Sequence, residues 1–242
     1  MITLRRATER EHHRRRKSEI WRTFPSQEPG GTLDSGFGAL EALNESHLEP
    51  GGRMPGHGRQ GAEVITYVRE GTVACEDSAG HSCRIHAGEF QQMTRGRGAH
   101  PAGMNASRVD SARVFQIWLH ASPAGPEPIQ EQKRFSAAQR RGVLCIIASP
   151  DGRKGSLRVH QDVLMHSALL EPGVHVVHAL SEGRRAWLHL VEGEAILGDI
   201  VLGTGDGAGV STDRAVSITA RETTEILLFD LQEPPARTVR EG

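Results

Sequence analysis

The chain has 242 residues, of which 37% are apolar, so it can bury a substantial core as one large β-domain or as two domains. Its 29 Lys and Arg against 30 Asp and Glu leave a formal net charge of -1. This balance excludes an overall basic field of the kind that attracts nucleic acid or an anionic membrane. The longest clearly apolar stretch, residues 143–148, is far too short to span a bilayer. We expect neither nucleic acid nor a membrane as a partner.

The N-terminal region is charged and polar. It opens with MITLRRATER, which lacks the apolar segment of a secretory leader, and we therefore expect a cytoplasmic protein. A basic cluster follows at residues 14–17 (RRRK). No aromatic residue interleaves this cluster and nearby glutamates dilute it, so the pattern favours a solvated N-terminal arm over a nucleic-acid contact.

Short strands joined by tight turns are predicted along the rest of the chain. Four apolar runs, each bounded by small or polar residues, are typical of β-strands: EVITYV (63–68), ARVFQIWL (112–119), RAWLHLV (185–191) and TEILLFDL (224–231). Residues 77–82 and 149–156 have the composition of turns. Helix is scarce, and the best short candidate is EQKRFSAAQRR at residues 131–141. The fold class is mainly β.

Two landmarks recur at one spacing. The tripeptide EPG at residues 49–51 returns at 171–173, and the dipeptide EG at 70–71 returns at 192–193, both 122 residues later. Such self-similarity indicates a duplicated β-unit. We expect two antiparallel barrels of the jelly-roll kind, each closing its own sheet edges, with an N-terminal domain over residues 1–128 and a C-terminal domain over residues 129–242.

The N-terminal half contains the frame of a metal-binding barrel motif. Residues two apart on a barrel strand point to the same side, so a His-x-His pair aims two imidazoles at one interior, where a neighbouring strand can add ligands for an iron-type metal. Residues 51–71 match such a cupin motif at every landmark except one, because the position two after His57 is Arg59. A second frame runs from Gly88 to Asn105, and its expected histidine position holds Pro101.

Six blocks in the same order resemble the pirin family: MITLRRATER, ITYVREGTVACEDSAG, AGEFQQMTRGRGAH, FQIWL, SPDGRKGSLRVHQD and ILLFDL. The resemblance covers residues 1–231. It implies a bicupin with two stacked β-barrels and few short helices, with an iron-type site only in the N-terminal barrel. It also implies activities that range from quercetin 2,3-dioxygenase to the binding of transcription regulators. Residues 25–38 depart from the family, which usually has an aromatic-rich stretch there.

The ligand set that the resemblance implies is three histidines and a glutamate. Only His57 matches, since the other three positions hold Arg59, Pro101 and Gly103. The permanent charge of Arg59 would repel a divalent ion. We therefore expect no bound cofactor. Arg59 either contacts a small anionic ligand in the barrel or lies exposed on a loop before the strand, and both readings stay open.

A weakly bound iron or other divalent ion is the alternative. Its candidate ligands are His57 and Glu63, with His100 or His47 as a third. His100 lies next to the expected ligand position, but adjacent strand residues face opposite sides of a sheet. Together, His57, Arg59, Glu63 and His100 are the candidates for lining a ligand pocket. No catalytic residue follows from the sequence.

The C-terminal half offers no substitute metal site. The positions 122 residues beyond His57, Arg59 and Glu63 hold alanine, serine and arginine. His175 and His178 are three apart, a spacing that places them on opposite faces of a strand. Residues 203–209 (GTGDGAG) are rich in glycine but lack the Lys-Ser/Thr pair of a phosphate loop, so turn glycines are expected there.

The cysteines predict no cross-link. Cys75, Cys83 and Cys145 are an odd number without Cys-x-x-Cys spacing, which suggests neither a disulfide framework nor a zinc cluster. Cys75 follows an apolar run and is expected to be a small core residue.

The leading hypothesis from the sequence is a pirin-like bicupin that has lost most metal ligands and acts as a non-catalytic binding or regulatory protein. Its partner would be a small anionic or aromatic ligand, or a regulatory protein. The competing hypothesis is a metal-dependent quercetin 2,3-dioxygenase-type oxidoreductase with an atypical site. A third is a surface for oligomerisation or protein interaction, which the lack of a small-molecule-sized cavity in the first barrel would favour.

Overall fold

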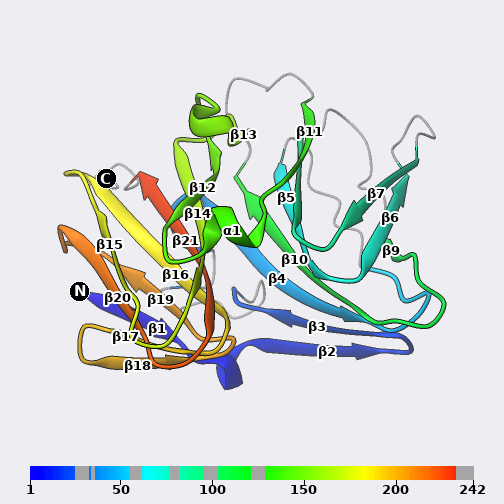
Figure 1. The fold of residues 1–242 in the computed structure, drawn as a ribbon, viewed down its shortest axis with the longest axis horizontal. Coiled ribbons are helices and arrows are strands. Elements are labelled where there is room, and N and C mark those ends of the chain that lie inside the picture. Colours follow the sequence, from blue (N-terminus) through cyan, green and yellow to red (C-terminus); the bar gives the residue numbers. More distant parts are fainter. Residues whose placement is uncertain are drawn as a thin grey trace, which may run out of the picture.

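A computed structural model describes residues 1–24, 33, 36–54, 62–76, 82–94, 103–120 and 129–232. These residues form four β-sheets that make two barrels side by side, with few short helices (Figure 1). The prediction of a mainly β protein with two barrels is confirmed. Among the residues described, no helix has the length and apolar character needed to cross a membrane.

The N-terminal barrel combines a seven-stranded sheet, here the large N-terminal sheet, with a three-stranded one, here the small N-terminal sheet. The large sheet has the order β11 (Gln130–Arg134), β8 (Glu89–Thr94), β5 (Glu63–Glu70), β10 (Ala112–Leu119), β4 (Leu40–Leu48), β3 (Ser18–Arg22) and β2 (Glu11–Arg15). The small sheet has the order β7 (Ser82–His86), β6 (Thr72–Glu76) and β9 (Met104–Asn105).

The C-terminal barrel repeats this plan with a seven-stranded and a four-stranded sheet. Its large sheet has the order β1 (Ile2–Arg5), β19 (Gly207–Val210), β16 (Arg184–Glu192), β21 (Thr224–Gln232), β14 (Val163–Leu170), β12 (Cys145–Ser149) and β13 (Leu157–Arg158). Its small sheet has the order β15 (His175–Ala179), β20 (Ala215–Ala220), β17 (Glu194–Leu197) and β18 (Ile200–Gly203). The helical turns are η1 (Ala7–Glu9), α1 (Ala137–Arg140) and η2 (Arg153–Gly155).

The two large sheets exchange their outer strands. β1, at the start of the chain, pairs with β19 of the C-terminal barrel, with Ile2 opposite Val210. β11, which follows the first half, pairs with β8 of the N-terminal barrel. In Figure 1 the blue β1 accordingly lies among the yellow and orange strands. The sheets therefore cross the division expected between residues 128 and 129, and each barrel needs the other half to complete its large sheet.

The recurring dipeptide EG marks equivalent turns of the two halves. Gly71 follows β5 and Gly193 follows β16, and both have positive φ angles, of 78° and 92°. A Cβ at Gly71 would lie 2.7 Å from the carbonyl oxygen of Ser111, and one at Gly193 would lie 2.5 Å from that of Thr223. Glycine is required at both turns because of this left-handed backbone and the close approach of a neighbouring strand.

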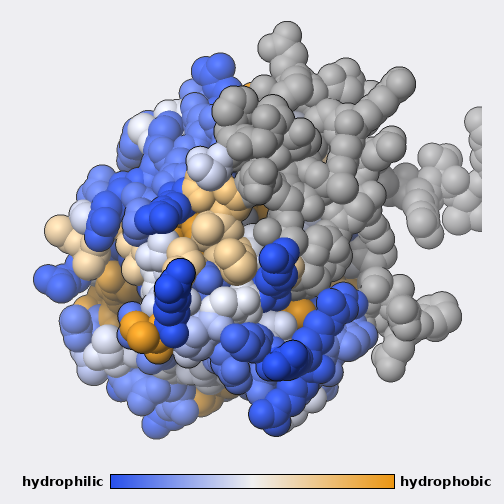
Figure 2. Space-filling view, turned by 90° about the vertical axis from the view of Figure 1, so that its right-hand side faces the viewer, coloured by the Kyte–Doolittle hydropathy of each residue, from blue (hydrophilic) through white to orange (hydrophobic). Residues whose placement is uncertain are grey.

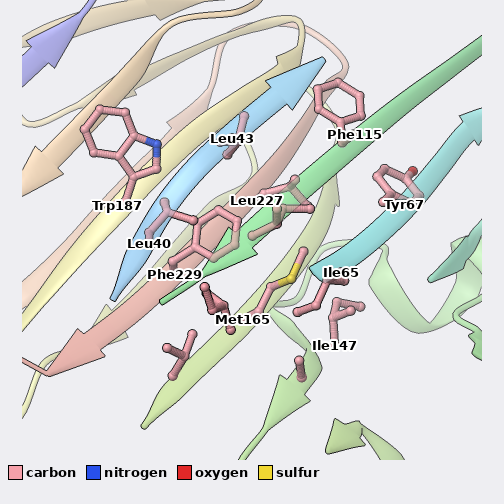
Figure 3. Packing of buried hydrophobic residues seen from close by; sticks show 14 of the residues in the cluster. Leu40, Leu43, Ile65, Tyr67, Phe115, Ile147, Met165, Trp187, Leu227 and Phe229 are labelled. Carbon is pink, nitrogen blue, oxygen red and sulfur yellow. The ribbon is translucent and has the colours of Figure 1, made fainter. Parts of the chain in front are cut away.

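The two large sheets pack face to face, and the main apolar core lies between the barrels. Every second residue of each strand points into this core, because successive side chains of a strand face opposite sides of the sheet. Figure 3 shows the packing of Leu40, Leu43, Ile65, Tyr67, Phe115, Ile147, Met165, Trp187, Leu227 and Phe229, all of which are buried. Such a core resembles an obligate interface, so the two barrels are expected to unfold together.

Two glycines of β19 allow this core to form. A Cβ at Gly207 would lie 2.3 Å from Cζ2 of Trp187, and one at Gly209 would lie 2.5 Å from the ring of Phe37. The prediction of turn glycines for residues 203–209 is thus only partly right: Gly205 has a positive φ of 84°, but Gly207 and Gly209 are strand residues that make room for aromatic rings.

Most of the atypical segment 25–38 lies outside the described residues. Its described members Leu33 and Phe37 are buried in the core between the barrels, and Phe37 packs on Trp187 with ring centroids 5.4 Å apart.

Two local predictions need correction. Residues 131–141 do not form one helix: β11 takes up the first part, and only the single turn α1 follows, with the Ser136 side chain as its N-cap. The basic cluster at residues 14–17 is not an arm, because its first two residues end β2 and its last two form the turn of the β2–β3 hairpin at the edge of the large N-terminal sheet. Figure 2 shows a predominantly hydrophilic surface over the described residues on one side of the molecule.

Candidate functional site

The N-terminal barrel contains a small, partly open cavity of about 40 Å³ between its two sheets. Its described lining residues are Met54, Val64, Thr66, Val73, Cys75, Ile85, Gln91, Met93, Gly103, Gln116 and Trp118. A cavity of this size holds only one to a few water molecules. The C-terminal barrel instead has a large aliphatic core, made mainly of Leu, Val, Ala and Ile side chains.

The cavity wall on the large sheet has one polar row and one apolar row. In the polar row, Thr66 of β5 lies opposite Gln116 of β10 and Gln91 of β8. In the next row, Val64 lies opposite Trp118 and Met93. Oε1 of Gln116 is buried without a hydrogen-bond partner among the described residues. Buried polar groups normally have partners, so this row is suited to a guest that carries hydroxyl groups.

Glu63 does not line the cavity. It precedes Val64 on β5 and so faces the opposite side, towards the C-terminal barrel, where its side chain is fully buried. Its carboxylate accepts hydrogen bonds from the backbone N–H groups of His160 at 2.8 and 3.0 Å and of Gln161 at 3.1 Å. Nδ1 of His160 lies 2.9 Å from Oε1. The structure therefore corrects the expectation that Glu63 is a pocket residue: it joins the two barrels.

Most of the other expected site residues fall outside the part of the chain that the structure describes. His57, Arg59 and His100 lie outside the described residues, as does Pro101. His47 is described, and it lies on the outer face of β4, where its Nε2 is 2.9 Å from Oε1 of Glu45.

Position 103, where the family resemblance implies a glutamate ligand, holds a glycine whose side-chain space is taken by the end of the flexible Met54 side chain. A Cβ built on Gly103 would lie 2.1 Å from Cε of Met54 and 3.0 Å from Cγ1 of Val73. The described cavity wall contains no imidazole and no carboxylate. In the described ranges as a whole, no three His, Cys, Asp or Glu side chains are grouped to hold a metal ion. Of the four ligand positions that the resemblance implies, only position 103 is described, and its glycine supplies no ligand.

A charged network that the sequence did not indicate crosses the interface between the barrels. Arg113 donates from Nε to Glu45 at 2.7 Å and from Nη2 to the carbonyl oxygen of Val191 at 2.7 Å. Burial disfavours ionisation of Glu45, but the hydrogen bond from His47 and the charges of Arg113 and Arg10 outweigh it and lower the pKa of Glu45. The carboxylate stays charged and holds Arg113, which reaches Val191 of the other barrel.

A second part of this network centres on Tyr67. Its hydroxyl donates to Glu225 at 2.5 Å, and Arg140 donates from Nη1 to Glu225 at 2.9 Å and to the Tyr67 oxygen at 3.1 Å. Burial and the nearby carboxylate of Glu225 raise the pKa of Tyr67 well above its ordinary value of 10.0. These groups come from β5, β21 and α1, so their meeting depends on the packing of the barrels.

The C-terminal barrel contains a polar cluster at one end. His178 on β15 lies 2.8 Å from Oδ2 of Asp230 on β21, and its ring centroid is 4.8 Å from that of His166 on β14. Burial and neighbouring His178 lower the pKa of His166 to about 4. Arg184 also donates to Asp230. The sequence spacing of His175 and His178 could not indicate this cluster, since its members come from separate strands.

Cys75 and Cys83 form a disulfide, contrary to the expectation from the odd cysteine count. They face each other directly across the β6–β7 pair, with Cα atoms 5.1 Å apart. Cys75 also lines the cavity. The free cysteine is Cys145, which is partly buried on β12.

Two barrels of one topology, stacked through their large sheets, define a bicupin of the cupin superfamily. The Pirin family profile matches residues 13–119, and a profile described as the quercetinase C-terminal cupin domain matches residues 146–231. Quercetin 2,3-dioxygenase of Escherichia coli strain K12 is 36% identical over 235 residues, which are 97% of this chain and 100% of that protein. The chain belongs to the pirin family, and this confirms the resemblance found in the sequence.

Two further relatives support membership of the pirin family. A pirin-like protein of Caulobacter vibrioides is 31% identical over 195 residues, which are 80% of this chain and 84% of that protein. The crystal structure of the bacterial pirin YhhW from Escherichia coli in complex with nickel(II) matches with a TM-score of 0.88 at 34% identity. That match covers 97% of this chain and 100% of the other.

Proposed function

We propose that this chain is a quercetin 2,3-dioxygenase-type oxidoreductase that takes a flavonol-class substrate in its N-terminal cavity. The observation that carries the proposal is the full-length 36% identity to the quercetin 2,3-dioxygenase of Escherichia coli. The relatives bearing this name favour an oxygenase over the non-catalytic binding protein that the sequence led us to expect.

The chemistry of the cavity supports the substrate class. A flavonol is a flat aromatic compound with several hydroxyl groups. The row of Gln91, Thr66 and Gln116 offers donors and acceptors for hydroxyl groups, and the row of Trp118 and Val64 offers an apolar surface for an aromatic ring. The cavity is water-sized, so such a guest requires displacement of its wall.

A second candidate function is flavonol binding without oxygenation, with a regulatory protein as the further partner. One observation favours it: position 103 holds a glycine, with Met54 in the side-chain space, and so does not supply the expected carboxylate. Because the described residues supply none of the ligands that the resemblance implies, we derive no reaction step through a metal. In both candidates the ligand class is the same, and only the fate of the ligand differs.

The experiment measures quercetin turnover and metal content on the same sample. Protein purified without chelator and supplied with ferrous iron is assayed for dioxygen consumption with quercetin and for metal by elemental mass spectrometry. His57→Ala is the test variant and His175→Ala, an exposed histidine of the other barrel, is the matched control. Turnover with near-stoichiometric metal that falls only in His57→Ala supports the oxygenase. Quercetin binding without turnover or metal supports the second candidate, and absence of binding refutes both.

The cavity itself is tested by Gln116→Leu, which removes the buried carboxamide but keeps a side chain of similar size. We expect quercetin affinity to fall by about tenfold, the effect of losing one hydrogen bond to a buried hydroxyl. Gln232→Leu is the control, because this exposed residue ends β21 in the other barrel and does not line the cavity. Equal affinities in the two variants would place the ligand elsewhere.

A further inference from the structure

The disulfide lies in the wall of the cavity. Cys75 on β6 and Ile85 on β7 both line it, so the two cysteines connect the strands that form its wall on the side of the small sheet. In the described residues β7 pairs only with β6, and it is an edge strand of a three-stranded sheet. Short edge strands are among the elements that open most readily. The covalent bond therefore fastens the weakest part of the wall.

A buried carboxamide contacts both sulfur atoms. Gln91 is only 4% exposed, and its Nε2 donates to Sγ of Cys83 at 3.4 Å. Its Oε1 lies 4.0 Å from Sγ of Cys75, within reach of a thiol proton. In the disulfide Cys75 has no proton to donate, so this second hydrogen bond exists only in the reduced pair. Gln91 thus offers a partner to both sulfurs when they are thiols and to Cys83 when they are joined.

The pair is also not sealed inside the core of the barrel. Both cysteines are partly exposed, whereas most of the apolar wall behind them is buried. Thiol–disulfide exchange requires access of an attacking thiolate to one sulfur of the bond. A structural disulfide hidden in a core would lack this access.

We propose that Cys75 and Cys83 form a reversible disulfide that controls access to the N-terminal cavity, closed when oxidised and open when reduced. The oxidant is a low-molecular-weight disulfide such as glutathione disulfide. One cysteine thiolate attacks it, forms a mixed disulfide and releases one glutathione thiol. The second cysteine then attacks the protein-bound sulfur and releases the second, so two protein thiols become a disulfide and one glutathione disulfide becomes two thiols.

The first measurement is the redox titration of the whole chain in glutathione buffers, followed by alkylation and mass measurement. The chain has three cysteines, so the reduced protein has three free thiols and the oxidised protein has one, that of Cys145. Cys145→Ser, which leaves only the pair, is the control and should titrate identically. A pair that stays oxidised in an excess of reduced glutathione is a fixed structural cross-link and overturns the proposal.

The second measurement is access to the cavity, followed through Trp118, which lines it and is 3% exposed. Acrylamide quenching of tryptophan fluorescence is recorded in both redox states, and the signal of Trp118→Phe is subtracted to isolate this indole from the other two. We expect quenching of Trp118 to rise about twofold on reduction, as the β6–β7 wall opens.

The variant Cys83→Ser, which cannot form the bond, should match the reduced protein whatever the buffer. Quenching that does not change with the state of the pair refutes control of the cavity, even if the pair itself is reversible.

The consequence for flavonols rests on the function proposed above, whereas the thiol titration and the quenching experiment do not. With quercetin as the probe, we expect the oxidised protein to bind about tenfold more weakly than the reduced protein. If quercetin binds neither form while Trp118 still responds to reduction, the proposed function fails and the redox control stands. If quercetin binds both forms equally, the redox control of binding fails and the proposed function stands.

Discussion

Replacing Glu63 with alanine should destabilise the whole molecule by about 4 kcal/mol. The fully buried carboxylate accepts from the backbone N–H groups of His160 and Gln161 at 2.8 to 3.1 Å, and these donors belong to the other barrel. Alanine leaves both partly buried donors without a partner, and each such loss costs about 1–3 kcal/mol. Glu63→Gln keeps one acceptor but turns an amide towards a donor, so about half of the loss is expected.

The assay is urea unfolding followed by circular dichroism, with the free energy of unfolding taken from a single transition. Glu131→Ala is the matched control, because this carboxylate also accepts from a backbone N–H of the other barrel, that of Arg158 at 3.0 Å, but at an exposed site. The control should cost less than about 1 kcal/mol. If Glu63→Ala costs no more than this, the carboxylate does not hold the barrels together. A stable Glu63→Ala protein that loses bound metal would restore its predicted role as a ligand.

Three further predictions follow from buried positions. Gly207→Ala places a methyl group against the indole of β16 and should cost about 1–3 kcal/mol, whereas Gly203→Ala, with open space around it, should cost less; equal urea midpoints would contradict this. The single tyrosine, Tyr67, should show no phenolate absorbance at a pH where the urea-unfolded chain already does, because burial raises its pKa. His166 has a folded pKa of about 4, below its unfolded value of 6.5, so the unfolded chain binds the extra proton first and the free energy of unfolding falls as pH drops from 6.5 to 4. His166→Gln should flatten this dependence and the exposed His175→Gln should not.

The sequence predicted the strands well but not their partners. The apolar runs at residues 63–68, 112–119, 185–191 and 224–231 fall within β5, β10, β16 and β21. Each of these strands is an apolar run with small or polar residues at its ends, and this feature is visible in the local sequence. The pairing of β1 with β19 is set by packing between residues about two hundred positions apart, and no local signal indicates it.

The site was harder to predict because β5 is buried on both faces. Ile65 and Tyr67 point to the core between the barrels while Val64 and Val68 point into the N-terminal barrel, so apolar character does not reveal which face carries the cavity. Glu63 lies on the same face of β5 as Ile65 and Tyr67, so the sequence could not show that its side chain points away from the cavity. A strand with one solvent-exposed face would have shown its orientation by alternation.

An odd number of cysteines does not indicate a disulfide, whereas the position of two of them around a predicted turn does. Cys75 and Cys83 lie almost equally far from the centre of the turn predicted at residues 77–82. In a hairpin, residues equidistant from the turn face each other, and this register brings their Cα atoms to 5.1 Å. The third cysteine, Cys145, lies on another strand and does not change this register.

The contrast between the two barrels bears on what the N-terminal one does. Both have the same topology, yet the C-terminal barrel is filled with aliphatic side chains while the N-terminal barrel keeps Thr66, Gln91 and Gln116 in one buried row. Buried carboxamides without full hydrogen bonding destabilise a fold, so a barrel kept for stability alone would have an apolar interior. This row lies on β5, β8 and β10 and does not depend on position 103. The flavonol binding proposed for this barrel therefore depends on residues other than position 103, and the space that Met54 fills beside Gly103 bears on the proposed oxygenation alone.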